Sequence, residues 1–155
     1  MIPPEIFTYI KSKRVCVVAL EMPDGSPHAA AVHFAHIEEP LTFILQTSLK
    51  SKKGEAFLNK DSVRMSLVIG VEEVPGNKEK TFQLDGVARI VKEDESHFIE
   101  TYFEKFTEKN GKHATDIFFL VTPTWWRFTD WSRPEGKTIY NSDGTMTVRG
   151  KILNN

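Results

Sequence analysis

The chain has 155 residues, of which 40% are hydrophobic and 26% are charged, and its formal net charge is −1. This composition is typical of one soluble globular domain with a sizeable core, and the balanced charge gives no general attraction to nucleic acid or acidic membranes. No apolar run approaches the roughly 20 residues of a membrane helix, no signal peptide is visible, and a single cysteine, Cys16, excludes an internal disulfide. We therefore expect a cytoplasmic protein in which Cys16 is an inert core residue.

The first part of the chain predicts one helix and three strands. The helix covers residues 3–12, because two prolines suit its first turn and its apolar residues share one face. Strands follow at residues 15–21, 28–36 and 41–47. The second of these contains three consecutive alanines, which favour helix, but the turns on both sides favour a hairpin. On a strand, such small side chains leave room above the sheet for a flat ligand or a packed helix.

The second part of the chain predicts further strands, two helices and a hairpin. In order, these are a short helix at 54–60, a strand at 62–71, a strand at 81–91, an amphipathic helix at 93–107, a strand at 116–131 and a hairpin at 138–148. Gly86 interrupts the second of these strands, as a β-bulge or a close backbone approach would. Most connections are short, which favours an antiparallel barrel of six or seven strands with two or three flanking helices. We assign residues 1–135 to the barrel domain and residues 136–155 to a C-terminal hairpin of the same domain.

The most informative stretch is the turn between the strand at 41–47 and the helix after it. This turn is rich in hydroxyl groups and places Lys50, Lys52 and Lys53 where a helix begins. The start of a helix carries partial positive charge from unpaired N–H groups, so acidic residues are favourable there. The lysines repel one another unless an anion lies among them, and a phosphate is the obvious anion. A solvated lysine cluster explains the same spacing equally well.

Two other groups of residues are candidate sites. Three histidines, His28, His33 and His36, suggest a metal ion, but on a strand His33 points away from the other two, so all three cannot converge. Trp125 and Trp126 are adjacent in a strand and therefore face opposite sides. At least one of them lies outside the core, either as an anchor for an interface or a stacked ligand or as simple edge packing.

The order of these segments resembles the pyridoxamine 5′-phosphate oxidase-like superfamily, the FMN-binding split β-barrels. The matching pieces are residues 28–34, 43–48, 51–53, 59–65, 81–88 and 123–130. The resemblance covers roughly residues 1–131, and it rests on the order and spacing of the segments rather than on one specific motif. It implies a mainly β (α+β) fold, a split barrel, and a homodimer with two FMN sites at the subunit interface.

The resemblance also implies which residues bind the cofactor. Those at 51–53 match a Ser-Arg-Lys element that holds the FMN phosphate, and those at 46–48 match the segment that lines the flavin and its ribityl chain. The alanine strand would lie along the isoalloxazine ring, and residues from the later strands would close the site from the same subunit or its partner. The implied set is Ala30, Ala31, Val32, His33, Gln46, Thr47, Ser48, Ser51, Lys52, Lys53, Gln83, Trp126 and Arg127.

The expected function is that of an FMN-dependent oxidoreductase acting on an unknown small molecule, with a reduced nicotinamide as a candidate donor. FAD, a deazaflavin or haem are the alternative cofactors in related proteins. True pyridoxamine-phosphate oxidases carry an Arg-x-His-x-Arg-like element where this chain has Arg127, Thr129 and Trp131, so the vitamin B6 reaction is not expected. A non-catalytic flavin protein for storage or sensing, and a ligand-free dimeric barrel acting as an interaction module, are the other functions left open.

Overall fold

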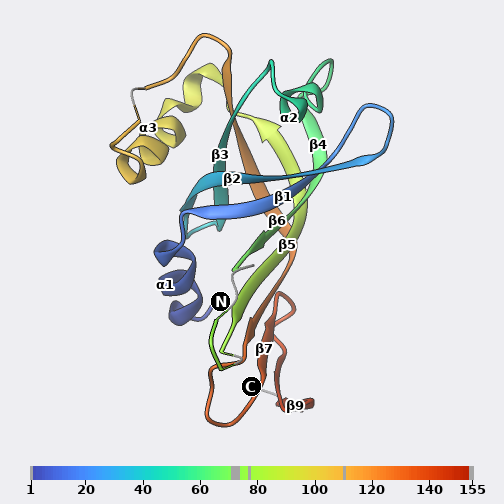
Figure 1. The fold of residues 1–155 in the computed structure, drawn as a ribbon, viewed down its shortest axis with the longest axis vertical. Coiled ribbons are helices and arrows are strands. Elements are labelled where there is room, and N and C mark those ends of the chain that lie inside the picture. The colour runs from blue at the N-terminus through green and yellow to red at the C-terminus, as the bar shows by residue number, and fades with distance from the viewer. Residues whose placement is uncertain (1, 71–73, 77, 110, 154–155) are drawn as a thin grey trace.

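The computed structural model describes residues 2–70, 74–76, 78–109 and 111–153 (Figure 1). Its strands are β1 (Val15–Glu21), β2 (Pro27–Ile37), β3 (Thr42–Ser48), β4 (Ser62–Ile69), β5 (Lys80–Ile90), β6 (Asp116–Asp130), β7 (Thr138–Asn141), β8 (Met146–Val148) and β9 (Lys151–Leu153). Its helices are α1 (Pro4–Ser12), α2 (Lys52–Glu55), the 3-10 turn η1 (Glu93–Glu95) and α3 (Ser96–Lys105).

The strands form one antiparallel sheet that closes on itself. In the described part of the chain their order is β3-β2-β1-β4-β5-β6-β7-β8-β9, and an additional pairing between β3 and β6 closes the first six into a barrel. Inward residues of the strands form the core of the barrel; on β4, for example, Val63, Met65, Leu67 and Ile69 all face the core. The predicted antiparallel barrel of six or seven strands is confirmed, with six strands in its closed part. The predicted strand corresponding to β4 extended to Val71, which lies outside the described residues.

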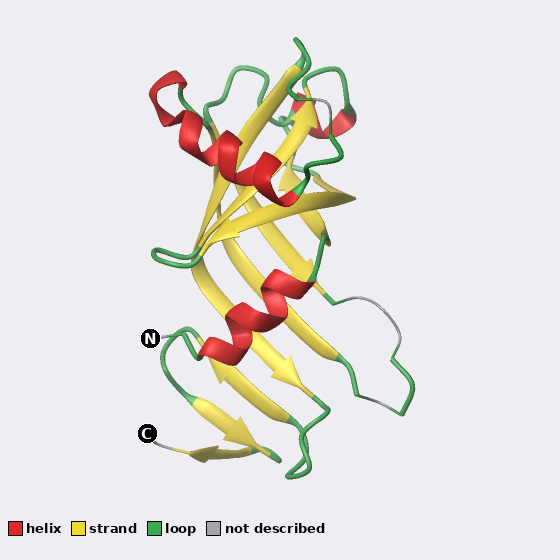
Figure 2. Cartoon of the chain, turned by 90° about the vertical axis from the view of Figure 1, so that its left-hand side faces the viewer, coloured by secondary structure: helices red, strands yellow, loops and turns green. Residues whose placement is uncertain are grey.

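Two helices complete the core from different sides (Figure 2). Helix α1 inserts Ile6 and Ile10, both fully buried, into the barrel interior. Helix α3 lies on the outer surface instead, where Tyr102 and Phe106 pack on outward residues of β2, β3 and β6. Helix α3 therefore covers one part of the outer face of the barrel.

The short helix after β3 differs from the prediction. We expected it at residues 54–60, but α2 begins at Lys52 and ends at Glu55. Ser51 starts the helix early because its side chain accepts a hydrogen bond from the Gly54 N–H at 3.3 Å. Non-helical turns follow, and Asn59 adopts a left-handed conformation with φ of 68°. The helix is thus a single turn.

The irregularity predicted at Gly86 is confirmed as a close backbone approach, and the extra residue of the bulge, Thr124, belongs to β6. The register between β5 and β6 shifts between Asp85 and Gly86, and Gly86 lies opposite Pro123. A Cβ at Gly86 would meet the Thr122 carbonyl oxygen at 2.5 Å, so the close approach of the two backbones requires glycine. Because the bulge accommodates the proline, β6 continues through it as one strand of 15 residues.

Strands β7–β9 extend the sheet beyond the barrel, and we call residues 138–153 the C-terminal arm. Asp130, at the end of β6 before the arm, is 1% exposed. It accepts hydrogen bonds from Ser132 and forms ion pairs with Lys80 and Arg133. Burial alone would raise the pKa of Asp130, but these partners more than offset it, so the pKa is lowered. The hairpin of β7 and β8 is as predicted, whereas β9 is an additional strand. None of the helices in the described ranges is long and apolar enough to span a bilayer.

Candidate functional site

The barrel is split between β2 and β3. These strands pair only from Phe34 opposite Leu45 to Ile37 opposite Thr42. Before Phe34, β2 pairs with β1, and after Leu45, β3 pairs with β6. The alanine segment of β2 and the end of β3, which the sequence assigned to one cofactor site, thus border this divergence from opposite sides. Helix α2 lies against both strands.

The turn from β3 to α2 is built from hydroxyl groups. The Thr47 and Ser51 hydroxyl oxygens lie 2.9 Å apart, and the Ser51 hydroxyl donates to the Ser48 carbonyl oxygen at 2.7 Å. The Ser48 hydroxyl accepts from the Lys50 N–H at 3.2 Å. Gly54 is buried against this turn, because a Cβ there would overlap the Ser48 carbonyl oxygen. The backbone of the turn is therefore fixed before any ligand arrives.

The lysines of this turn differ in their partners. Lys52 pairs with Glu55 at 2.6 Å, and both side chains are exposed enough for the pair to be weak. Lys50 and Lys53 make no ion pair with any residue in the described ranges. Two unpaired ammonium groups beside a rigid, hydroxyl-rich turn suit a phosphate group. Since α2 is one turn long, attraction to an anion there depends on the lysine charges rather than on a helix dipole.

Gln46 is held by residues that the sequence analysis did not identify. Its amide nitrogen donates to Asp116 at 2.7 Å, and its amide oxygen accepts from Lys109 at 3.4 Å. Lys109 also donates to the Tyr102 hydroxyl at 2.7 Å. These partners come from β6 and from the segment after α3, so no local sequence pattern could reveal them. The Gln46 amide is engaged within the protein and orients the end of β3.

Basic side chains surround the buried ring of Phe106. Arg14, Lys109 and Lys105 lie 4.8, 5.1 and 5.9 Å from the ring centroid, and the His33 ring lies 5.1 Å from it. Burial, followed by the charge of Arg14, lowers the pKa of Lys105 to about 8. Burial also lowers the pKa of His33 and of Lys109. His33 is thus placed beside a positively charged region that favours its neutral form.

A second group of predicted residues lies on the open outer face of the barrel. Cross-strand register aligns Ala31, Val17, Val68, Gln83 and Arg127 in one row over five strands. Their side chains point away from the core, because directly opposed residues share a face. Three of the predicted site residues, from β2, β5 and β6, therefore share one surface that α3 does not cover.

The remaining predicted residues face the barrel interior. Val32 is 8% exposed, and Ala30 lies opposite the buried Val18. Trp126 stacks on Phe82 with ring centroids 6.0 Å apart and packs against the core. Its neighbour Trp125 shares the outer face with Arg127, as the alternation of a strand predicts.

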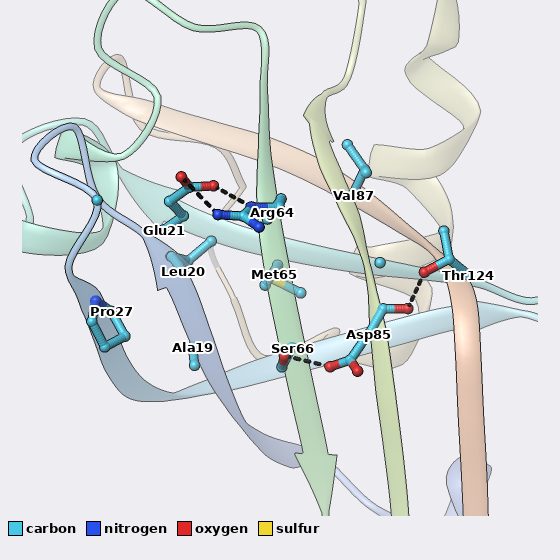
Figure 3. A pocket seen from close by; sticks show the side chains of 12 residues that line it. Ala19, Leu20, Glu21, Pro27, Arg64, Met65, Ser66, Asp85, Val87 and Thr124 are labelled. Atoms are coloured by element: carbon cyan, nitrogen blue, oxygen red, sulfur yellow. Dashed lines mark hydrogen bonds and ion pairs between the residues drawn. The ribbon is translucent and has the colours of Figure 1, made fainter.

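A hollow of about 540 Å³ lies on the same outer face (Figure 3). An ion pair between Arg64 and Glu21 borders it, with a nitrogen-to-oxygen distance of 2.8 Å. Asp85 accepts from the Ser66 hydroxyl at 2.5 Å, and the Asp85 carbonyl oxygen accepts from Thr124 at 3.1 Å. Ala19, Ser66 and Gly86 are small residues of its lining, and the hollow adjoins the row that contains Gln83 and Arg127.

Two further observations concern metals and thiols. In residues 2–70, 74–76, 78–109 and 111–153, no three histidine, cysteine, aspartate or glutamate side chains are grouped to hold a metal ion. Cys16 is 1% exposed, and burial raises its pKa to about 12. A thiol in that state is a poor nucleophile, so Cys16 is a core residue as predicted.

The sequence comparisons define the class of protein. The family model for pyridoxamine 5′-phosphate oxidase matches residues 2–130, and the chain belongs to this family. The match contains the whole barrel and ends at the last residue of β6, before the C-terminal arm. No curated protein matches the sequence significantly.

Solved structures share the fold at low sequence identity. A conserved hypothetical protein, Rv2991, from Mycobacterium tuberculosis has a TM-score of 0.65 and 22% identity, over 84% of this chain and 85% of that chain. A heme-binding protein from Mycobacterium smegmatis has a TM-score of 0.67 and 13% identity, over 92% of this chain and 60% of that chain. An FAD-binding protein from the same organism has a TM-score of 0.57 and 16% identity, over 83% and 94%.

Proposed function

We propose that this protein binds FMN at a site shared by two copies of the chain and uses it to oxidise or reduce a small molecule. The observation that carries the proposal is the β3–α2 turn, where Lys50 and Lys53 have no ion-pair partner in the described ranges and flank a rigid hydroxyl cluster. Family membership supports the choice of a flavin. The names of structural neighbours include both an FAD-binding and a heme-binding protein, so haem is the principal alternative.

The proposed roles follow from the positions of the side chains. Lys53 and Lys50 neutralise the phosphate, and the Thr47 and Ser51 hydroxyls lie beside them. His33, on the opposite border of the split, faces the ligand in its neutral form. Bound flavin supplies the redox chemistry, while the residues of the chain supply position and electrostatics.

The proposed second copy explains why the predicted residues form two groups. The hydroxyl-lysine turn lies beside the split, whereas Gln83 and Arg127 lie on the open outer face of β5 and β6. In a homodimer, the outer face of one copy closes over the turn of the other. Both groups then contribute to each site, and the dimer contains two sites.

An absorption spectrum of the purified protein tests the cofactor. We expect flavin bands near ~450 nm that persist through gel filtration, whereas a haem protein would show a strong Soret band instead. A colourless protein that also fails to bind added FMN would rule out the proposal. Gel filtration with light scattering measures the molar mass, and the proposal requires the mass of a dimer.

Substitution of the lysines tests the location of the phosphate. Lys53→Ala should weaken FMN binding by about 1–3 kcal/mol, because one charge-assisted contact is lost. Lys52→Ala should have a smaller effect, since Lys52 already pairs with Glu55. Lys60→Ala, an exposed lysine outside the turn, is the matched control. An unchanged dissociation constant for Lys53→Ala would place the phosphate elsewhere.

Anaerobic mixing with NADH or NADPH separates an enzyme from a storage or sensing protein. Bleaching of the bound flavin at a rate that saturates with donor concentration would support an oxidoreductase. If neither nicotinamide reduces the flavin, the non-catalytic flavin protein becomes the better description of this chain.

A further inference from the structure

A chain of hydrogen bonds connects the C-terminal arm to Arg127. The Arg127 Nε–H donates to the Asn141 amide oxygen at 2.9 Å, and the Asn141 amide nitrogen donates to the Thr145 hydroxyl at 2.9 Å. The Thr145 hydroxyl donates in turn to the Asp143 carboxylate at 2.7 Å. All three partners belong to the hairpin between β7 and β8, which lies beyond residue 130, where the family match ends.

The chemistry of the partners fixes the direction of this chain. Arg Nε can only donate, so the Asn141 oxygen must face Arg127 and its NH₂ group must face Thr145. An ionised carboxylate can only accept, so the Thr145 hydroxyl points its hydrogen at Asp143. The Asp143 pKa is lowered, first by the hydrogen bonds from the Thr145 hydroxyl and N–H, and Arg127 contributes. Each bond polarises the next, which strengthens the hold on Arg127.

The hairpin itself is rigidly attached to β6. The Ser142 N–H donates to the Trp126 carbonyl oxygen at 3.0 Å, and the Asn141 N–H donates to the Thr145 carbonyl oxygen at 3.0 Å. Gly144 adopts φ of 85°, which a tight turn requires there. Asn141 is therefore presented to Arg127 by a turn whose own hydrogen bonds are satisfied.

The guanidinium group is also supported on one face. Its central carbon lies 5.4 Å from the ring centroid of Trp125, on the outer face of β6. The Nε–H is used by Asn141, which leaves the N–H groups of both terminal nitrogens. Arg127 makes no ion pair with any residue in the described ranges. The end of the guanidinium is thus an oriented fork of N–H donors of the kind that binds a phosphate.

We propose that Asn141 is a positioning residue that holds the Arg127 fork ready for the phosphate of FMN bound to the partner copy. The inference rests on the proposed function, and it assigns the C-terminal arm a role in the cofactor site. The two lysines of the turn and the fork of Arg127 then approach the phosphate from different copies. Without Asn141, Arg127 keeps its charge but loses the orientation that a two-point contact needs.

A double-mutant cycle tests this role in the full-length dimer. Dissociation constants for FMN are measured by fluorescence quenching for the unaltered chain, Arg127→Ala, Asn141→Leu and the double variant. We expect Arg127→Ala to weaken binding about 30-fold and Asn141→Leu about fivefold. The double variant should bind no more weakly than Arg127→Ala alone, because Asn141 acts only through Arg127. Additive losses would show that Asn141 acts by another route and would overturn the inference.

Riboflavin, which lacks the phosphate, is the second probe. We expect Asn141→Leu and Arg127→Ala to bind riboflavin as the unaltered chain does. An equal loss of affinity for FMN and for riboflavin would mean that Arg127 does not contact the phosphate. Ser142→Ala, an exposed neighbour, is the matched control, and Thr145→Val is a second variant in case Asn141→Leu disturbs the hairpin. If the unaltered chain binds neither ligand, the proposed function fails, whereas normal FMN binding by Asn141→Leu overturns this inference alone.

Discussion

The outer surface of the barrel has two halves of opposite character. Under α3, the outward residues of β3 and β6 are large and apolar, and Ile44, Phe118 and Leu120 are all nearly inaccessible. On the open half, the outward residues are mixed: Ala31 and Gln83 are small or polar, whereas Val87 is apolar and 47% exposed. The two halves belong to the same sheet and even share β2. The side chains of the sheet thus differ according to whether α3 covers them.

The largest difference in stability between the two halves should come from truncating a buried side chain beneath α3. Phe106 is fully buried between α3 and the sheet, so Phe106→Ala should lower the free energy of unfolding by about 3–5 kcal/mol. Val87, on the open half, is 47% exposed, and Val87→Ala should cost less than about 1 kcal/mol. Urea unfolding at low protein concentration measures both. Similar losses for the two variants would show that the halves do not differ in this way.

A matched pair on β2 provides a second test at one strand. Ala31 and Ala35 both point outward, but Ala31 is exposed and Ala35 is 1% exposed beneath α3. Ala35→Phe should destabilise the fold by about 1–3 kcal/mol through overpacking. Ala31→Phe should leave the unfolding midpoint unchanged at protein concentrations too low for association, and at higher concentrations it should weaken FMN binding and dimer formation. Normal binding by Ala31→Phe would remove this part of β2 from the proposed site.

The smallest effect is the pH dependence of stability expected from Lys105, at the end of α3. Lys105 donates to the Lys13 carbonyl oxygen at 2.6 Å, and its pKa is lowered to about 8, whereas an unfolded chain keeps a lysine pKa of about 10.4. Between these values the unfolded chain binds more protons, so the stability of the native protein should rise with pH relative to Lys105→Met. Unfolding curves of both proteins at about pH 7.5 and about pH 10, which enclose most of the interval between the two pKa values, measure the difference in stability. A constant difference would show that Lys105 is solvated.

The barrel could be predicted because its signals are local. Alternation located β4 and β5, and the isolated Gly86 located the bulge opposite Pro123. The start of α2 was misplaced because capping by Ser51 outweighed the helical pattern after Gly54. The hairpin of β7 and β8 was recognised from its turn, whereas β9 has three exposed residues and no pattern.

The candidate site was predicted less completely, for a physical reason. Sequence order could nominate Gln46, but its partners Lys109 and Asp116 are 63 and 70 positions away. Arg127 differs, because its partner Asn141 lies only 14 positions away on the next strand, and only the register of β6 with β7 sets them opposite each other. Contacts between segments distant in sequence depend on the closed sheet, and only the structure provides them.

The pairing of β3 with β6 also has a consequence for the order of folding. Phe43 lies opposite Val121, so this contact joins residues 78 positions apart (121 minus 43), whereas the β1–β2 hairpin joins near neighbours. Closing so long a loop costs conformational entropy, and this cost must be offset by other contacts before the pairing stabilises the fold. We therefore expect the hairpins to form first and the seam between β3 and β6 to close late. In pulsed hydrogen exchange during refolding, the amides of β3 that pair with β6 should gain protection after those of β1.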